Sequence, residues 1–232
     1  MPQDKTNEKQ RIWDLPTRIF HWSLVVCIGY SWWSAEYGEL IWHQRCGYIL
    51  LALIIFRILW GFWGSSTSRF GHFLHGPKTV FNYIKTLFIK SPSNAKENPQ
   101  TEYPIGHNPL GGWSVIVLLL VILGQILLGL FSEDVDGLDS GPLSYLVSYD
   151  VGRWAAKTHE ALFDVLIILI GIHIFAAFFY LFYKHTNLIK PMFTGKISSP
   201  TNTTSESLVF RPLWIAILTL VASSIFVWWL VN

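Results

Sequence analysis

The longest apolar segment of the chain covers residues 157–185, with the sequence KTHEALFDVLIILIGIHIFAAFFYLFYKH, and the expected fold follows from it. Between its charged ends it is almost wholly apolar, and it is long enough to cross about 30 Å of hydrocarbon as a single helix. Two histidines, His159 and His173, nevertheless lie inside the apolar part. Ionisable side chains inside a membrane are costly and are usually paired or functional, so these two imidazoles need partners.

The rest of the chain has the composition of a membrane protein. Of its 232 residues, 51% are hydrophobic and 16% aromatic, whereas only 14% are charged. Five segments are long and apolar enough to be predicted as membrane-spanning helices: 16–35, 41–63, 113–131, 159–183 and 213–231. The composition therefore predicts an all-α integral membrane protein.

Charged residues are distributed unevenly between the connections. Lysine and arginine gather in the N-terminal arm (1–18) and in the connections 64–112 and 184–212, whereas acidic residues dominate 36–39 and 132–157. The positive-inside rule then predicts a cytoplasmic N-terminus and an external C-terminus. The net charge is only +2, and the membrane orientation accounts for every basic stretch. Nucleic-acid binding is therefore not expected.

One of the basic connections contains an amphipathic segment. In GPKTVFNYIKTLFIK (76–90), apolar residues recur at helical spacing and the lysines lie off that stripe. This pattern predicts a helix that lies in the membrane interface, against lipid.

Four of the eight histidines fall within the predicted spans. His159 and His173, fourteen residues apart, lie within about 40° of each other on one helix and about 21 Å apart in depth. Because successive helices alternate in direction, His21 is expected at the level of His173 and His43 at the level of His159. Facing imidazoles from two helices can hold a cofactor, and two histidines on opposite sides of an iron describe a six-coordinate b-type haem. Two ligands per level are too few for a closed zinc site, and the c-type attachment motif C-x-x-C-H is absent.

Other polar and small residues support weaker expectations. Arg18 and Arg57 lie near the predicted cytoplasmic haem level, where they could bind haem propionates or serve only as positive-inside anchors. His107 is expected to be a loop residue rather than a ligand. Cys27 and Cys46 are expected at different depths, so no disulfide is predicted. Glycines in the spans would let helices approach each other or make room for a porphyrin face: Gly29, Gly47, Gly124, Gly129 and Gly171.

Six motifs carry a resemblance to a known family: WDLPTRIFHW (13–22), WHQRCGYILLALIIFRILWGFWG (42–64), GPKTVFNYIK (76–85), GHNPLGGW (106–113), THEALFDVLIILIGIH (158–173) and NLIKPMFTG (187–195). In this order, over residues 12–196, they resemble the bacterial cytochrome b561 family, which includes the b-type cytochrome subunits of nickel-iron hydrogenases. The resemblance implies an up-and-down four-helix di-haem bundle, here followed by a fifth C-terminal transmembrane helix. It also implies axial ligands His21, His43, His159 and His173.

The resemblance implies a quinone-linked electron carrier that moves electrons across the bacterial inner membrane. We expect two haem b groups, with quinone on one side of the reaction and a periplasmic c-type cytochrome or redox enzyme subunit on the other. The acidic loop 132–157 offers a docking surface for that partner. Two alternatives stay open: a stand-alone membrane oxidoreductase of the superoxide:quinone type, and a non-haem transporter or scaffold. The predicted organisation is an arm (1–12), a cytochrome domain (13–196), and a linker with the extra helix (197–232).

Overall fold

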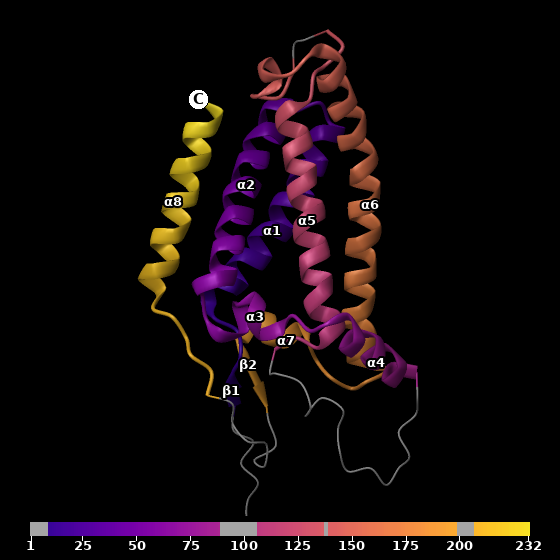
Figure 1. Cartoon of the computed structure of the whole chain (residues 1–232), viewed down its shortest axis with the longest axis vertical. Helices are drawn as coiled ribbons and strands as arrows, with labels where there is room; N and C mark the ends of the chain where they lie inside the picture. The colour runs from indigo at the N-terminus through magenta and orange to yellow at the C-terminus, as the bar shows by residue number, and fades with distance from the viewer. Residues whose placement is uncertain (1–8, 89–105, 137–138, 199–206) are drawn as a thin grey trace, which may run out of the picture.

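The computed structural model describes residues 9–88, 106–136, 139–198 and 207–232, and it is mostly helical (Figure 1). Its long helices are α1 (Leu15–Glu36), α2 (Leu40–Trp63), α5 (Pro109–Phe131), α6 (Tyr149–Phe182) and α8 (Leu213–Val231). The shorter elements are β1 (Lys9–Arg11), α3 (Phe70–Phe73), α4 (Pro77–Phe88), α7 (Ile189–Thr194), β2 (Lys196–Ser198) and the 3₁₀ turns Ser66–Ser68 and Ser144–Leu146. The structure agrees with the all-α class predicted from composition.

Within the described residues, four helices are long and apolar enough to cross a membrane: α2, α5, α6 and α8. Helix α1 has a spanning length of 22 residues, but Arg18, Glu36 and several small polar residues lower its hydropathy. Membrane spanning by α1, and the place of α8 as an extra span outside the bundle, therefore stay predictions. Helix α6 begins at Tyr149, ten residues before the predicted start, because the hydropathy pattern does not register the polar turns that extend the helix beyond the apolar segment.

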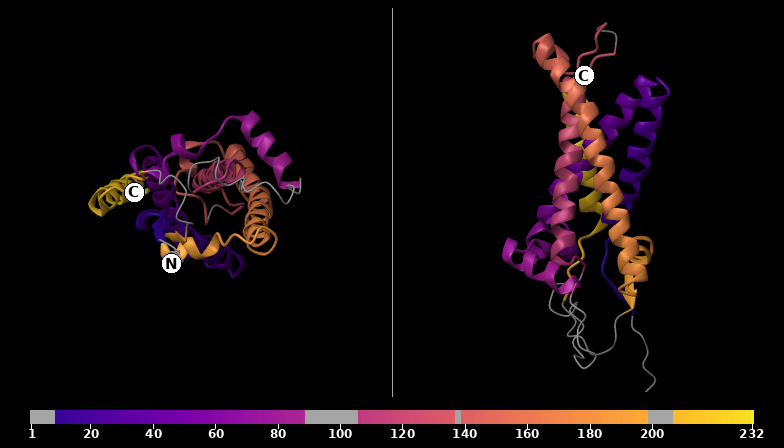
Figure 2. Two further views of the ribbon diagram at one scale, coloured as in Figure 1. Left: turned by 90° about the horizontal axis from the view of Figure 1, so that it is seen from below. Right: turned by 90° about the vertical axis from the view of Figure 1, so that its right-hand side faces the viewer.

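The first four long helices pack as two pairs, α1 with α2 and α5 with α6, and α2 joins the two pairs (Figures 1 and 2). Helix α1 packs on α2 and α5 packs on α6, while α2 also contacts α5 and α8. Helix α2 consequently contributes the largest share of the buried apolar core, including Leu50, Leu51 and Ile54. Helices α1 and α6, which carry His21 and His173, make no extensive backbone contact with each other.

Both ends of the bundle have a distinct charge. We call the basic end the one formed by residues 9–14, 64–88, 106–108 and 183–198, and the acidic end the one formed by residues 37–39, 132–136 and 139–150. Residues 1–8, most of the predicted arm, lie outside the described residues. At the basic end, β1 and β2 pair antiparallel, with Arg11 opposite Lys196. The backbone carbonyl of Gly195 also accepts from the amides of Ile12 and Trp13, at 2.8 and 3.2 Å.

Asp14 fixes the start of α1. Its carboxylate accepts from the Thr17 amide at 2.8 Å and caps the helix, with Pro16 in the first turn, where its missing N–H does no harm. The same carboxylate, only 1% exposed, accepts from the Trp60 indole at 3.0 Å and the Ser68 hydroxyl at 3.2 Å. One side chain thereby ties α1, the end of α2 and the following turn together.

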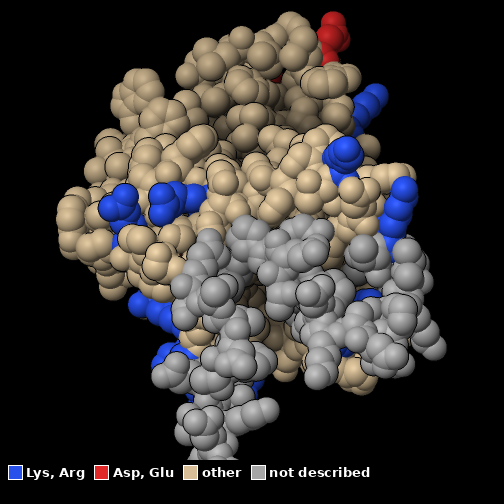
Figure 3. Space-filling view, turned by 60° about the horizontal axis from the view of Figure 1, so that its bottom comes forward, with Lys and Arg blue, Asp and Glu red and all other residues tan. Residues whose placement is uncertain are grey.

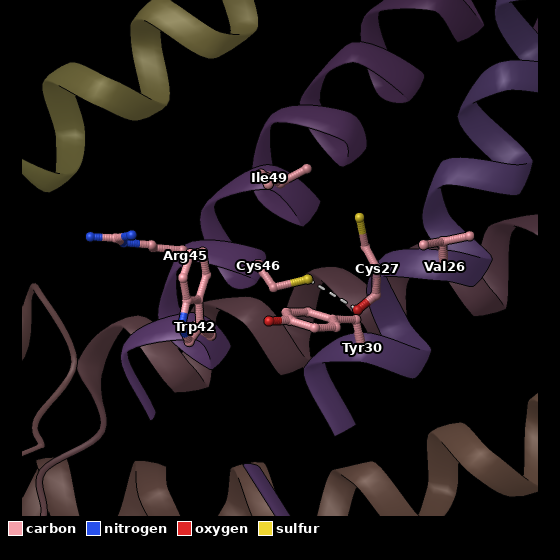
Figure 4. A pocket seen from close by; sticks show the side chains of 7 residues that line it. All are labelled: Val26, Cys27, Tyr30, Trp42, Arg45, Cys46 and Ile49. Atoms are coloured by element: carbon pink, nitrogen blue, oxygen red, sulfur yellow. Dashed lines mark hydrogen bonds between the residues drawn. The ribbon is translucent and has the colours of Figure 1, made fainter. Parts of the chain in front are cut away.

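The expectation that the two cysteines lie at different depths is wrong. The Cys46 thiol donates to the backbone carbonyl of Cys27 at 3.1 Å (Figure 4). Cys27 lies nine residues before the end of α1 and Cys46 six residues after the start of α2, a difference in depth of only about 5 Å. Both are free thiols in a surface groove of about 330 Å³ lined by Val26, Cys27, Tyr30, Trp42, Arg45, Cys46 and Ile49.

Candidate functional site

The four histidines of the bundle form two pairs at opposite ends. The ring centroids of His21 (α1) and His173 (α6) are 6.4 Å apart, toward the basic end. Those of His43 (α2) and His159 (α6) are 6.0 Å apart, toward the acidic end. The structure thus brings together the same partners that helix direction and spacing led us to expect, with α6 contributing to both pairs.

These separations suit one metal ion between the two rings of each pair. A bond from a metal to an imidazole nitrogen is about 2.1 Å, and the ring centre lies about 1.1 Å beyond, so opposed imidazoles on one metal have centroids about 6.4 Å apart. Among the described residues, no group of three or more His, Cys, Asp or Glu gathers that could hold a metal ion without further ligands. The donor set therefore fits haem, whose porphyrin supplies the remaining four ligands.

The histidines at the acidic end are held in one tautomer. The Nδ1 atom of His43 is 2.9 Å from the backbone carbonyl oxygen of Ser31, and Nδ1 of His159 is 2.8 Å from that of Gln125. A carbonyl oxygen only accepts hydrogen bonds, so each Nδ1 must carry the proton and donate it. Each Nε2 consequently keeps a free lone pair, which is the form that binds a metal.

Gly129 makes this arrangement possible at His159. A Cβ atom at position 129 would lie 3.1 Å from Cε1 and 3.3 Å from Nδ1 of the imidazole. Gly129 follows Gln125 by one helical turn, so a side chain here would stand between His159 and its carbonyl acceptor. At Gly124, on the same helix, an added Cβ would make only an ordinary contact of 3.5 Å with Leu162.

The face of α2 that carries His43 is open at Gly47. Gly47 lies one turn deeper than His43 on nearly the same face. An added Cβ at Gly47 would meet no atom within 4 Å. The expectation that glycines in the spans leave room beside the histidines therefore has a structural counterpart at Gly47, whereas Gly129 instead accommodates an imidazole.

The pair at the basic end has a different environment. Nδ1 of His21 is buried and has no hydrogen-bond partner among the described residues. The neighbouring Trp22 contacts the His21 ring edge-on, with centroids 5.0 Å apart. Trp22 also stacks on Phe193 at 4.4 Å and donates from its indole nitrogen to the Met192 carbonyl at 3.2 Å. Helix α7 therefore closes this end of the bundle beside His21.

Arg57 is a buried cation on the histidine-bearing face of α2. It follows His43 by fourteen residues, which places it within about 40° of His43 and about 21 Å deeper, near the level of His21. Only 3% of its surface is exposed, and its Nη1 atom finds no hydrogen-bond partner in the described part of the chain. The guanidinium carbon lies 5.2 Å from the ring centre of Phe70. Because a buried charge is costly without a hydrogen-bonded counter-ion, this site suits an anionic group of a cofactor.

Arg18 is largely engaged with the protein itself. Its Nη1 donates to the backbone carbonyl of Phe193, at the end of α7. Its Nε atom is buried without a partner among the described residues. The side chain thus holds α7 against α1, while its Nε–H has no acceptor among the described residues. The same residues border a cavity of about 280 Å³ lined by Leu15, Arg18, Ile19, Trp22, Ser23, Met192 and Phe193.

His107 is part of the packing at the basic end. Its ring contacts Trp13 edge-on at 4.8 Å and Phe73 at 4.4 Å, in the turn before α5. Burial, together with the nearby charges of Arg57 and His72, lowers the pKa of His107 to about 3. It is therefore neutral at physiological pH, and it lies apart from both histidine pairs.

Sequence reasoning missed the groups that orient the acidic-end pair. The acceptors are the main-chain carbonyls of Ser31 and Gln125. Every residue has a main-chain carbonyl, so the sequence does not show which ones accept a hydrogen bond from a histidine. Gly129 did carry a signal, as a small residue inside an apolar span. Its specific contact with His159 depends on how α5 and α6 are rotated against each other.

A bundle of apolar helices with facing imidazoles at two levels has the architecture of a b-type membrane cytochrome. Residues 12–195 match the family model described as prokaryotic cytochrome b561, so the chain belongs to that family, as the six sequence motifs predict. It is accordingly a membrane b-type cytochrome of electron transfer. No curated protein and no solved structure gave a match. Helix α8 lies outside the matched range.

Proposed function

We propose that this cytochrome holds two b-type haems per chain. His21 and His173 would hold one haem toward the basic end, and His43 and His159 would hold the other toward the acidic end. The observation that carries the proposal is the pair of centroid separations, 6.4 and 6.0 Å, at two separate levels of one bundle. Bound haem iron supplies a reversible one-electron oxidation and reduction.

The chain's own contribution is to fix the ligands and their protons. Helix α6 carries a ligand of each pair, with the two about 21 Å apart along its axis, which supports a relay between the two membrane surfaces. At the acidic end, His43 and His159 donate their Nδ1 protons to Ser31 and Gln125 and present Nε2 inward. Such hydrogen bonds raise the basicity of the ligand and hold the ring in one orientation.

Arg57 is proposed as a propionate ligand near the His21 level. Its support is the burial of a guanidinium whose Nη1 has no hydrogen-bond partner among the described residues, on the same face of α2 as His43. An arginine can bind a carboxylate through two parallel hydrogen bonds, which would satisfy this donor. Arg18 is proposed for the same role through its Nε–H, which has no acceptor among the described residues.

We further propose that electrons pass across the bacterial inner membrane between the quinone pool and a periplasmic redox partner, either a c-type cytochrome or an enzyme subunit. The charge asymmetry of the connections supports a cytoplasmic N-terminus and a periplasmic C-terminus. The acidic end would then face the periplasm, where the exposed carboxylates of Asp136, Asp139 and Asp150 favour a basic partner surface.

The proposal can be tested in vesicles that enclose ferricyanide and receive a quinol from outside. We expect the wild-type protein to reduce the trapped ferricyanide, and His21→Ala and His43→Ala to lose one haem each and most of the transfer. His185→Asn, a change at an exposed histidine beyond α6, should keep both haems and the full rate. Transfer by either single-haem variant at the wild-type rate would contradict a relay through both levels.

A further inference from the structure

Helix α4 projects sideways from the basic end instead of following the bundle axis (Figure 1). Its inward side is anchored by Tyr83, which is 3% exposed and whose hydroxyl lies 2.5 Å from that of Tyr180 on α6. The side-chain amide of Asn108, the cap of α5, donates to the same Tyr180 hydroxyl at 3.0 Å. Helix α4 is therefore bonded to the end of α6 and, through it, to the start of α5.

The depth of this region follows from its contacts with α5. The Trp113 indole, in the first turns of that apolar helix, donates to the backbone carbonyl of His75 at 2.9 Å. His75 lies just before α4, so the start of α4 is level with the beginning of the α5 span. Tryptophan near the end of a span is typical of the headgroup region. Helix α4 is thus positioned at the level of the lipid headgroups.

The outward side of α4 combines two cations with an exposed aromatic ring. Lys78, Phe81, Asn82 and Lys85 are all exposed and follow one another at the spacing of a single helix face. Phe81 is 59% exposed, and the Lys85 ammonium lies 4.4 Å from its ring centre. The sequence of α4 contains no acidic residue. We call these four residues the α4 outer face.

The described part of the basic end, to which α4 belongs, is rich in positive charge. Lysine and arginine side chains lie around the basic end, while the acidic side chains in view lie toward the opposite end (Figure 3). An exposed apolar ring between two lysines, at headgroup depth, matches a surface that has acyl chains on one side and phosphates on the other. Because α4 has no acidic residue to pair with Lys78 and Lys85, these lysines suit an anionic phosphodiester.

We propose that the α4 outer face binds anionic phospholipid headgroups of the leaflet at the basic end, and that the bound lipid steadies the end of α6 through the Tyr83–Tyr180 hydrogen bond. The lysines hold the phosphodiester and Phe81 inserts among the acyl chains. His173 lies two turns before Tyr180, on nearly the same face of α6. Only an effect of the bound lipid on His173 as a haem ligand rests on the proposed function.

Lipid retention tests the binding surface directly. The full-length holoprotein is placed in nanodiscs of phosphatidylcholine with a fraction of phosphatidylglycerol, and the lipids that stay bound are counted by native mass spectrometry. We expect enrichment of phosphatidylglycerol on the wild type and loss of most of it in the Lys78→Gln, Lys85→Gln variant. The matched control is Lys190→Gln, Lys196→Gln, which removes two exposed lysines of the same end outside α4. Equal retention by the two double variants would overturn the proposal.

Hydrogen exchange tests the mechanical link. Phosphatidylglycerol should slow amide exchange in residues 176–182 of the wild type, and Tyr83→Phe should abolish this slowing while retaining the lipid. Slowing that is unchanged in Tyr83→Phe would show that the hydroxyl pair is not the link. Neither readout requires haem, so a wild-type sample that lacks haem would contradict the proposed function and leave the lipid result standing.

Discussion

Replacing Gly129 by alanine is expected to raise the reduction potential of one haem and leave the other unchanged. The added Cβ would lie 3.1 Å from Cε1 of His159, so the imidazole has to retreat by a few tenths of an ångström. That retreat lengthens the 2.8 Å hydrogen bond from Nδ1 to the Gln125 carbonyl. A weaker Nδ1 bond makes the imidazole a poorer electron donor, which destabilises ferric relative to ferrous iron.

The size of the shift is bounded by the worth of that hydrogen bond. A protein hydrogen bond contributes about 0.5–1.5 kcal/mol net, and 59 mV corresponds to about 1.4 kcal/mol for a one-electron couple, so the upward shift should be about 20–60 mV. The His21–His173 level lies about 21 Å further along α6 and should titrate as in the wild type.

The assay is a redox titration of the purified protein, followed by visible absorption and fitted to two one-electron components. Gly124→Ala is the matched control on the same helix, since its added Cβ makes an ordinary 3.5 Å contact with Leu162. A downward shift in Gly129→Ala, an equal shift in both components, or the same shift in Gly124→Ala would refute the reasoning.

Three further predictions concern the basic end. Arg57→Gln should lower the potential of the haem near His21 by roughly tens of millivolts, because it removes a buried positive charge; an unchanged redox titration would exclude Arg57 from that site. Asp14→Ala should lower the free energy of unfolding by about 2 kcal/mol through the lost cap and the lost bonds to α2 and the turn after it, whereas the exposed Asp136→Ala should not; thermal unfolding of the two variants decides this. The pKa of His107 is about 3 in the folded protein and 6.5 in the unfolded chain, so the free energy of unfolding should be highest above about pH 6.5 and fall as the pH drops toward 3. His107→Gln should reduce this dependence when unfolding is measured against pH. A pH dependence equal to that of the wild type would contradict the prediction.

The histidine pairs could be anticipated because they depend on quantities that the sequence contains. Apolar length sets which segments span, alternation sets their direction, and the rise per residue sets the depth of His21, His43, His159 and His173. The same arithmetic applied to Cys27 and Cys46 gives a difference of only about 5 Å, and the Cys46 thiol reaches the backbone carbonyl of Cys27 across it.

What could not be anticipated depends on rotation and on main-chain groups. The main-chain carbonyls of Ser31 and Gln125 orient His43 and His159, and any residue type would supply such a carbonyl, although the Ser31 hydroxyl also lies 3.2 Å from Nδ1 of His43. The β1–β2 pairing joins Lys9–Arg11 to Lys196–Ser198, segments that are far apart in the sequence and too short to show a strand pattern. The Tyr83–Tyr180 bond depends on how an interface helix docks, which hydropathy does not encode.

The central claim is best tested by counting haem against protein in the purified full-length chain, with haem extracted as the pyridine complex and protein measured by amino-acid analysis. Two molecules of haem b for every polypeptide is the predicted result. A single haem, or none, in well-folded protein would contradict the assignment of both imidazole pairs as iron ligands.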